Sequence, residues 1–190
     1  MVKIRGDKVS LATLNLADAG KIAEWLNDLE VTLPLGDEAF SHVTVETIQH
    51  DIEKSPERSS GLRTFALIQN ADDCLIGRSA LYAIDYVNRS AKIGIFIGDK
   101  QHWNKGYGQE SLRLTLDYAF NLLNLNSVML GAVSFNARAI HCYQQAGFTE
   151  IGRIREARII GVERYDVILM DILAKEFRQH NESVVSLYLK

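Results

Sequence analysis

Cysteine and proline are both scarce in this sequence, with two of each among 190 residues. The cysteines, Cys74 and Cys142, form neither a CxxC pair nor another spacing typical of zinc sites, so we expect no metal cofactor. Two thiols in a chain without an apolar leader at its N-terminus favour a reducing compartment, and we expect a cytoplasmic protein. Two prolines and 13 glycines exclude a collagen-like or low-complexity chain.

The sequence also lacks a strong charge imbalance and a long apolar run. Its 21 basic and 24 acidic residues give a net charge of −3, without the basic footprint of a nucleic-acid-binding protein. The longest apolar runs fall far below the roughly 20 residues of a membrane-spanning helix, so we expect no membrane partner. We expect a single domain over residues 1–175 and a C-terminal tail over 176–190. The sequence leaves open whether strand edges pair into a homodimer.

Hydrophobic periodicity predicts an α+β domain. We expect helices, from apolar residues that recur every three or four positions, over 15–26, 44–54, 106–121 and 136–147. We expect strands, from short segments rich in β-forming residues, over 8–14, 64–68, 74–84, 91–98, 127–133, 148–160 and 163–173. Turns join the strands between 64 and 98, which predicts an antiparallel meander. Helices and strands alternate only in the middle of the chain, which indicates a mixed sheet.

The most informative stretch is GIFIGDKQHWNKGYGQES, residues 94–111, in which a buried strand enters a glycine-containing loop that opens a helix. Gly106 and Gly108 allow the backbone to approach a ligand closely. The helix start presents unpaired N–H groups and the positive end of the helix dipole, and Lys105 adds a cation. These features together predict a site for phosphate or pyrophosphate.

Two common phosphate-binding patterns do not fit this loop. The pattern GxxxxGK[ST] is absent, and the dinucleotide pattern GxGxxG fails because Ser111 stands in the place of its third glycine. Both a P-loop nucleoside triphosphatase and a nicotinamide-dependent enzyme are therefore disfavoured. A module in which the loop binds ATP or NAD stays as an alternative.

A second motif, NARAIHCYQQAGF, covers residues 136–148. Asn136 suits a helix N-cap and Gly147 suits the residue after a helix end. On this helix Asn136, Ile140 and Tyr143 share one face. Because the helix follows the strand beside the glycine-loop helix, Tyr143 either points to the same ligand or packs in the core.

The motifs WNKGYG (103–108) and Asn136…Tyr143…Gly147 together resemble those of the GNAT family of N-acetyltransferases. The similarity extends over about residues 11–173 and is greatest to the branch with ribosomal-protein N-terminal and spermidine acetyltransferases. It implies one central mixed, mostly antiparallel sheet of about seven strands, splayed between two parallel strands, with helices on both faces. Trp103 stands where the family has Arg or Gln, so Lys105 and backbone amides would supply more of the phosphate recognition.

The resemblance also implies roles for individual residues. Acetyl-CoA would be the co-substrate, its pantetheine arm pairing with the backbone of Ile95, Phe96 and Ile97. The loop that holds its pyrophosphate would comprise Trp103, Asn104, Lys105, Gly106, Tyr107, Gly108 and Gln109. Asn136 would bind the pantetheine arm or the acyl end. Tyr143 would act as the general acid that protonates the departing CoA thiolate.

The acceptor amine is the least determined feature. The implied reaction is direct attack by a primary amine in a ternary complex, and the resemblance favours a protein or peptide N-terminal amine. The acidic residues of the early segment either form a solvated loop or attract a cationic amine; they are Asp28, Glu30, Asp37 and Glu38. Arg158 and Arg164 would instead repel a polyamine. A polyamine or a small-molecule amine is therefore an alternative acceptor. An alternative of another class is a non-catalytic acyl-CoA-binding sensor.

No residue is identified as the general base. We expect Glu110 to compensate the charge of the helix start, and Asp99 and His102 to be solvated turn residues. We expect His141 at the surface and Cys142 as a small packed hydrophobe.

Overall fold

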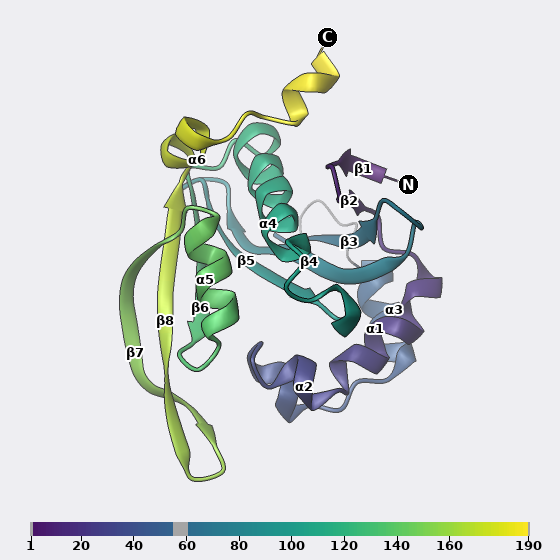
Figure 1. Ribbon diagram of the computed structural model, residues 1–190, viewed down its shortest axis with the longest axis vertical. Coiled ribbons are helices and arrows are strands. Elements are labelled where there is room, and N and C mark those ends of the chain that lie inside the picture. The colour runs from purple at the N-terminus through teal and green to yellow at the C-terminus, as the bar shows by residue number, and fades with distance from the viewer. Residues whose placement is uncertain (1, 55–60, 190) are drawn as a thin grey trace.

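The computed structural model describes residues 2–54 and 61–189 and contains one sheet with helices on both faces (Figure 1). The strand order is β1-β2-β3-β4-β5-β6-β8-β7. The strands are β1 (Val2–Arg5), β2 (Val9–Ala12), β3 (Arg63–Gln69), β4 (Leu75–Asp85), β5 (Ser90–Ile97), β6 (Ser127–Val133), β7 (Thr149–Ile160) and β8 (Glu163–Leu173). All neighbouring strands are antiparallel except β5 and β6. The expected mixed, mostly antiparallel sheet is confirmed.

The helices lie in two groups on the two faces of the sheet. They are α1 (Ala19–Leu26), α2 (Leu29–Thr32), α3 (Val45–Lys54), α4 (Tyr107–Asp117), α5 (Ala137–Gln145) and α6 (Ala174–His180). Apolar residues of α1 and α3 form one core cluster, with Phe96 of β5 packed against it. Apolar residues of α4 form a second cluster with β6 and β8, against which α5 packs. β5 lies between these two helical layers, so successive side chains of β5 face opposite layers. Among the described residues, no helix is both long and apolar enough to cross a membrane.

The sheet has eight strands, one more than the sequence predicts, because β1 was not expected. Its four residues are too few for a clear periodicity signal. The strand is stabilised by long-range contacts instead, since Ile4 is buried in the cluster around Leu67 and Leu114. Glu110 secures the turn after it, because its carboxylate accepts hydrogen bonds from the backbone N–H groups of Asp7 and Lys8. Glu110 thus has a structural role, with these amides as partners.

β5 and β6 form only a short parallel ladder. The paired residues are Ser90 with Ser127, Ala91 with Val128 and Lys92 with Met129. Beyond Lys92, β5 continues beside β4 and β6 continues beside β8, so the two strands part. The edge of β5 that faces away from β4 is therefore not paired with β6 beyond Lys92.

The C-terminal residues expected as a tail pack on the domain. Helix α6 buries Phe177 in the cluster around α4 and β8. The carboxylate of Asp117, which is fully buried, accepts hydrogen bonds from the Ser183 hydroxyl at 2.7 Å and the Val185 N–H at 3.0 Å. A buried carboxylate needs such partners. These contacts hold the segment after residue 176 against the end of α4.

Candidate active site

A cleft of about 680 Å³ opens where β5 and β6 part. The residues from the two motifs converge on it. The lining includes Ile95, Phe96, Ile97, Trp103, Asn104, Gly106, Tyr107, Gly108, Gln109, Asn136 and Tyr143. Lys105 does not line the cleft. Its side chain is exposed, and its carbonyl accepts a hydrogen bond from the Lys8 ammonium at 3.2 Å. The expectation that Lys105 would present a cation to the ligand is therefore not met by this geometry.

The glycine loop needs glycine at one position for conformational reasons. Gly106 has φ +84°, in the left-handed region, and is the N-cap of α4. A Cβ there would also lie 3.4 Å from the Lys8 Nζ, so a second basic side chain lies beside the loop. Sequence reasoning did not find Lys8, because it lies about a hundred positions earlier in the chain. The first amides of α4 open toward the cleft, which is the arrangement that binds anions.

His102 is not the solvated turn residue that we expected. Its side chain is only 14% exposed, its Nδ1 lies 3.2 Å from the Asp99 carboxylate, and its Nε2 lies 2.6 Å from the Gln69 Oε1. Gln69 in turn donates to the Tyr107 hydroxyl at 3.0 Å. Asp99 also caps the short helix η4 (Lys100–His102) by accepting from the Gln101 N–H. This chain of polar contacts fixes the conformation of the loop between β5 and α4.

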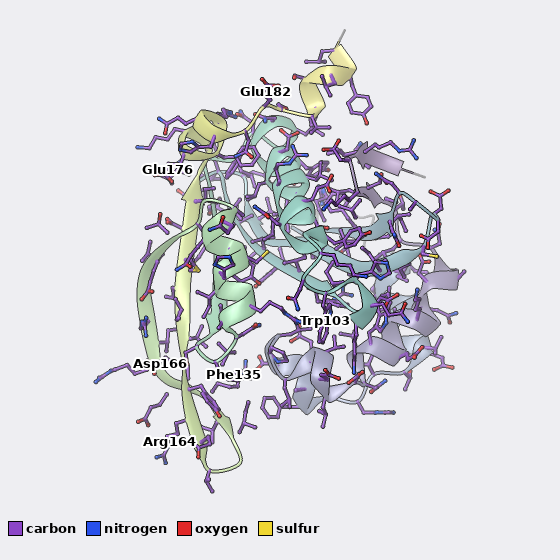
Figure 2. The ribbon with its side chains drawn as sticks, viewed as in Figure 1. Trp103, Phe135, Arg164, Asp166, Glu176 and Glu182 are labelled. Atoms are coloured by element: carbon purple, nitrogen blue, oxygen red, sulfur yellow. The ribbon has the colours of Figure 1, made fainter. Side chains whose placement is uncertain are left out.

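Trp103 turns back toward β5. Its indole N–H donates to the Ile97 carbonyl at 2.7 Å, and its ring packs against the cluster formed by α1 and α3. Figure 2 shows Trp103 between the ribbons of α5 and α2. The guanidinium of Arg138, from α5, lies over this ring at 3.9 Å from its centroid. This stack joins α5 to the loop between β5 and α4.

Tyr143 lines the cleft from α5, while its ring lies edge-on to Phe148 at 6.0 Å between centroids. Burial raises the pKa of its phenol well above the ordinary value, and the neighbouring Cys142 and Tyr82 act in the same direction. Its hydroxyl makes no hydrogen bond within the described parts of the chain. The geometry thus leaves a protonated phenol facing the cleft.

Both ends of the Asn136 side chain are occupied by protein contacts. Its Oδ1 accepts from the Ala139 N–H at 3.1 Å, which caps α5 as expected, and its Nδ2 donates to the Pro34 carbonyl at 3.0 Å. Asn136 therefore joins α5 to the segment after α2. His141 is exposed and Cys142 packs against the core, both as expected.

The other end of the cleft holds polar side chains from β4 and from the segment after α2. Arg78 and Tyr82 face the cleft from β4, and Glu38 faces it from the short helix η2 (Asp37–Phe40). The Arg78 guanidinium lies over the Phe96 ring at 5.8 Å, and burial lowers its pKa while Glu38 opposes that shift. Burial, and then Glu38, raises the pKa of Tyr82. Period-two alternation places Arg78 and Tyr82 on one face of β4, but only the fold shows that this face meets the cleft.

At this end of the cleft, three of the four acidic side chains considered for the acceptor form ion pairs with basic side chains. Asp28 and Glu30 both pair with Lys100, the first at 2.7 Å, and Lys100 lowers the pKa of Asp28. Asp37 pairs with Arg158 of the β7–β8 hairpin at 2.7 Å. Arg158 was expected to repel a polyamine, but its charge is balanced by Asp37. Glu38 is left facing the cleft without an ion-pair partner in residues 2–54 and 61–189.

The structure offers no candidate metal centre in the residues it describes, because none of their His, Cys, Asp and Glu side chains form a group of three or more suited to a metal ion.

Comparisons with known proteins place this geometry in a family. The model of the acetyltransferase (GNAT) domain matches residues 8–149. A spermidine N(1)-acetyltransferase of Vibrio cholerae is 34% identical over 116 residues, which are 61% of this chain and 66%, just under two thirds, of that protein. The putative ribosomal N-acetyltransferase YdaF of Bacillus subtilis is 27% identical over 171 residues, 90% of this chain and 88% of that protein.

Solved structures similar to this fold belong to the same kind of enzyme as the relatives found by sequence. The crystal structure of spermidine N-acetyltransferase from Vibrio cholerae in complex with CoA and spermine superposes with a TM-score of 0.81 at 27% identity. The superposition covers 91% of this chain and 99% of that one. The two folds thus agree over nearly the whole of both chains. The chain belongs to the GNAT family of acetyltransferases, which are acyl-CoA-dependent N-acetyltransferases.

Proposed function

We propose that this protein transfers the acetyl group of acetyl-CoA to a primary amine of a polyamine or another small cationic amine. The observation that carries this proposal is Glu38, a carboxylate that faces the cleft without an ion-pair partner while its acidic neighbours Asp28, Glu30 and Asp37 are paired among the described residues. A partly desolvated carboxylate attracts a cationic amine. Similarity to the spermidine acetyltransferase that binds CoA and spermine supports the same acceptor class over the peptide amine favoured by the sequence.

Acetyl-CoA fits the loop end of the cleft in this proposal. The amides at the start of α4 and the close approach allowed by Gly106 suit a pyrophosphate. The edge of β5 beyond Lys92, which is not paired with β6, suits an extended amide-containing arm, and one of its N–H groups would polarise the acetyl carbonyl.

The proposed reaction is a direct transfer. The amine gives up a proton to solvent, and its lone pair attacks the acetyl carbon. The new C–N bond forms and the C–S bond breaks, so that CoA leaves as a thiolate. Tyr143 donates its phenolic proton to that sulfur and recovers a proton from solvent. Burial keeps the Tyr143 phenol protonated at neutral pH, so its proton is available as negative charge develops on the departing sulfur.

Glu38→Gln should raise the KM for spermidine by about 10-fold, because the variant loses a charge contact of about 1 kcal/mol or slightly more. The Kd for acetyl-CoA should not change, since Glu38 lies at the opposite end of the cleft. Initial rates of thiol release against spermidine concentration measure the first value, and calorimetric titration measures the second. Glu163→Gln, at the exposed tip of the β7–β8 hairpin, is the matched control. An unchanged KM for spermidine would remove Glu38 from the acceptor site.

Arg78 supports a second candidate acceptor, a peptide or protein N-terminal amine. Its guanidinium forms no hydrogen bond or ion pair within the part of the chain that the structure describes, although it lines the cleft. A guanidinium in such a place suits a carbonyl or carboxylate oxygen. An N-terminal residue carries such an oxygen close to its amine, whereas a polyamine carries none.

Arg78→Met separates the two acceptors. For a polyamine, we expect the KM to fall by up to about fivefold, because a repelling cation is removed from the cleft. For a short peptide with a free N-terminus, we expect kcat/KM to fall by 10-fold or more, because a charge-assisted hydrogen bond is lost. Rates of thiol release with spermidine and with such a peptide, for wild type and variant, give the result. A wild-type enzyme that acetylates the peptide faster than spermidine would favour the second candidate.

Two further alternatives are tested by binding and turnover together. Saturable binding of acetyl-CoA without thiol release in the presence of any amine would support a non-catalytic sensor. Displacement of acetyl-CoA by ATP or NAD would support a nucleotide-binding module.

A further inference from the structure

The glycine loop presents backbone amides to the cleft but no basic side chain of its own. Trp103 begins the motif, and the Lys105 side chain is exposed and does not line the cleft. A pyrophosphate carries two negative charges, and amides with a helix dipole offset only part of such a charge. Lys8 lies beside Gly106 but does not line the cleft, so a cation from another element would complete the site.

Arg138 is such a cation. It lies in the first turn of α5, lines the cleft together with Asn104 and Gln109, and forms no hydrogen bond or ion pair with the residues described. Its guanidinium carbon lies 3.9 Å from the centroid of Trp103, whose own N–H is bound to the Ile97 carbonyl. A guanidinium held by its face keeps the N–H groups at its edge free to donate.

The part of α5 that carries Arg138 lies close to the start of α4. Cys142 lies one turn further along the same face of α5, and its Sγ is 3.7 Å from the place of a Cβ on Gly108. Burial raises the pKa of the Cys142 thiol, and the positive charge of Arg138 opposes that rise. Arg138 and the amides of α4 therefore face the same space.

We infer that Arg138 binds the pyrophosphate of acetyl-CoA and that Trp103 positions it for this contact. The inference rests on the proposed function, because it assumes that acetyl-CoA occupies the glycine loop. The planar guanidinium matches two phosphate oxygens at once. Stacking on Trp103 fixes the long side chain before the ligand arrives, which lowers the entropy lost on binding. The tryptophan at the start of the motif then has a function, since it carries the cation that the loop lacks.

Calorimetric titration of the full chain with two ligands tests this assignment. Arg138→Gln should weaken acetyl-CoA binding by about 10- to 100-fold, as expected for a lost charge-assisted hydrogen bond to phosphate. Binding of S-acetylpantetheine, which has the same acyl arm without pyrophosphate, should not change. The loss should persist with acetyl-dephospho-CoA, which keeps the pyrophosphate and lacks the 3′-phosphate. Arg155→Gln, an exposed arginine on β7, is the matched control for loss of one charge.

A second variant tests the part played by Trp103. Trp103→Leu should weaken acetyl-CoA binding, and Arg138→Gln should cost less in that background than in the wild type, because the two residues act together. Equal losses for acetyl-CoA and S-acetylpantetheine, or a loss that disappears with acetyl-dephospho-CoA, would overturn the assignment to pyrophosphate. An Arg138→Gln variant with wild-type affinity would also overturn it. If wild-type protein bound no acetyl-CoA, the proposed function itself would fail.

Discussion

Tyr143→Phe should lower kcat by about 100-fold and leave the Kd for acetyl-CoA unchanged. The variant keeps the ring that packs edge-on to Phe148 and removes only the hydroxyl that faces the cleft. Without a proton donor, the departing thiolate must take its proton from water. Initial rates of thiol release at saturating amine give kcat, and calorimetric titration gives the Kd.

Tyr82→Phe is the matched control, because Tyr82 is a second tyrosine that lines the same cleft. We expect it to change kcat by less than about threefold, a change that excludes the loss of a general acid. Unchanged turnover in Tyr143→Phe would contradict the assignment, and a large loss in Tyr82→Phe alone would transfer the role to Tyr82.

The pH dependence gives an independent check on Tyr143. Burial raises the pKa of this phenol, so it keeps its proton throughout the neutral and moderately alkaline range. The rate with wild type should therefore rise with pH as the amine is deprotonated, and Tyr143 should cause no decline before the alkaline limit of the assay. A decline in kcat with a midpoint near neutral pH would indicate a different acid.

Gly106→Asp should abolish measurable binding of acetyl-CoA, a loss of at least about 100-fold. The change places a carboxylate beside the amides that we propose bind the pyrophosphate, so that like charges would repel. It also adds a side chain at φ +84°, although Asp tolerates this conformation better than most residues. Calorimetric titration with acetyl-CoA measures the affinity, and thermal unfolding verifies that the domain is folded.

Gly161→Asp separates the effect of the charge from that of the backbone. Gly161 has φ +63° in the turn between β7 and β8, and a Cβ there meets nothing within 4 Å. This control adds the same residue in a similar conformation far from the loop, and we expect normal affinity. Retained affinity in Gly106→Asp would mean that the pyrophosphate lies elsewhere.

Several elements could be predicted from the sequence because their signals are local. Apolar spacing predicts α4 and α5, and the capping residues Asn136 and Gly147 mark the ends of α5 within one or two positions. Gly106 predicts a backbone conformation closed to most other residues, and the structure has φ +84° at this position. Strand β1 and helix α6 were not expected, since each is short and is held by contacts with distant residues.

The charged groups of the candidate site show where local reasoning stops. Asp37 and Glu38 are adjacent and chemically alike, yet one is paired with Arg158 and the other faces the cleft. The pairing joins residues 121 positions apart, so no local pattern predicts it. The same holds for Arg138 and Trp103, whose contact depends on how α5 meets the loop before α4.

The sequence by itself determined the family, the glycine loop and the helix that carries Tyr143, because these depend on residue type and spacing within single elements. Only the tertiary structure decided where β5 and β6 part, which carboxylate faces the cleft and which arginine lies over Trp103. These features depend on strand register and on long-range ion pairs, and both are set by the packing of the whole sheet and its two helical layers.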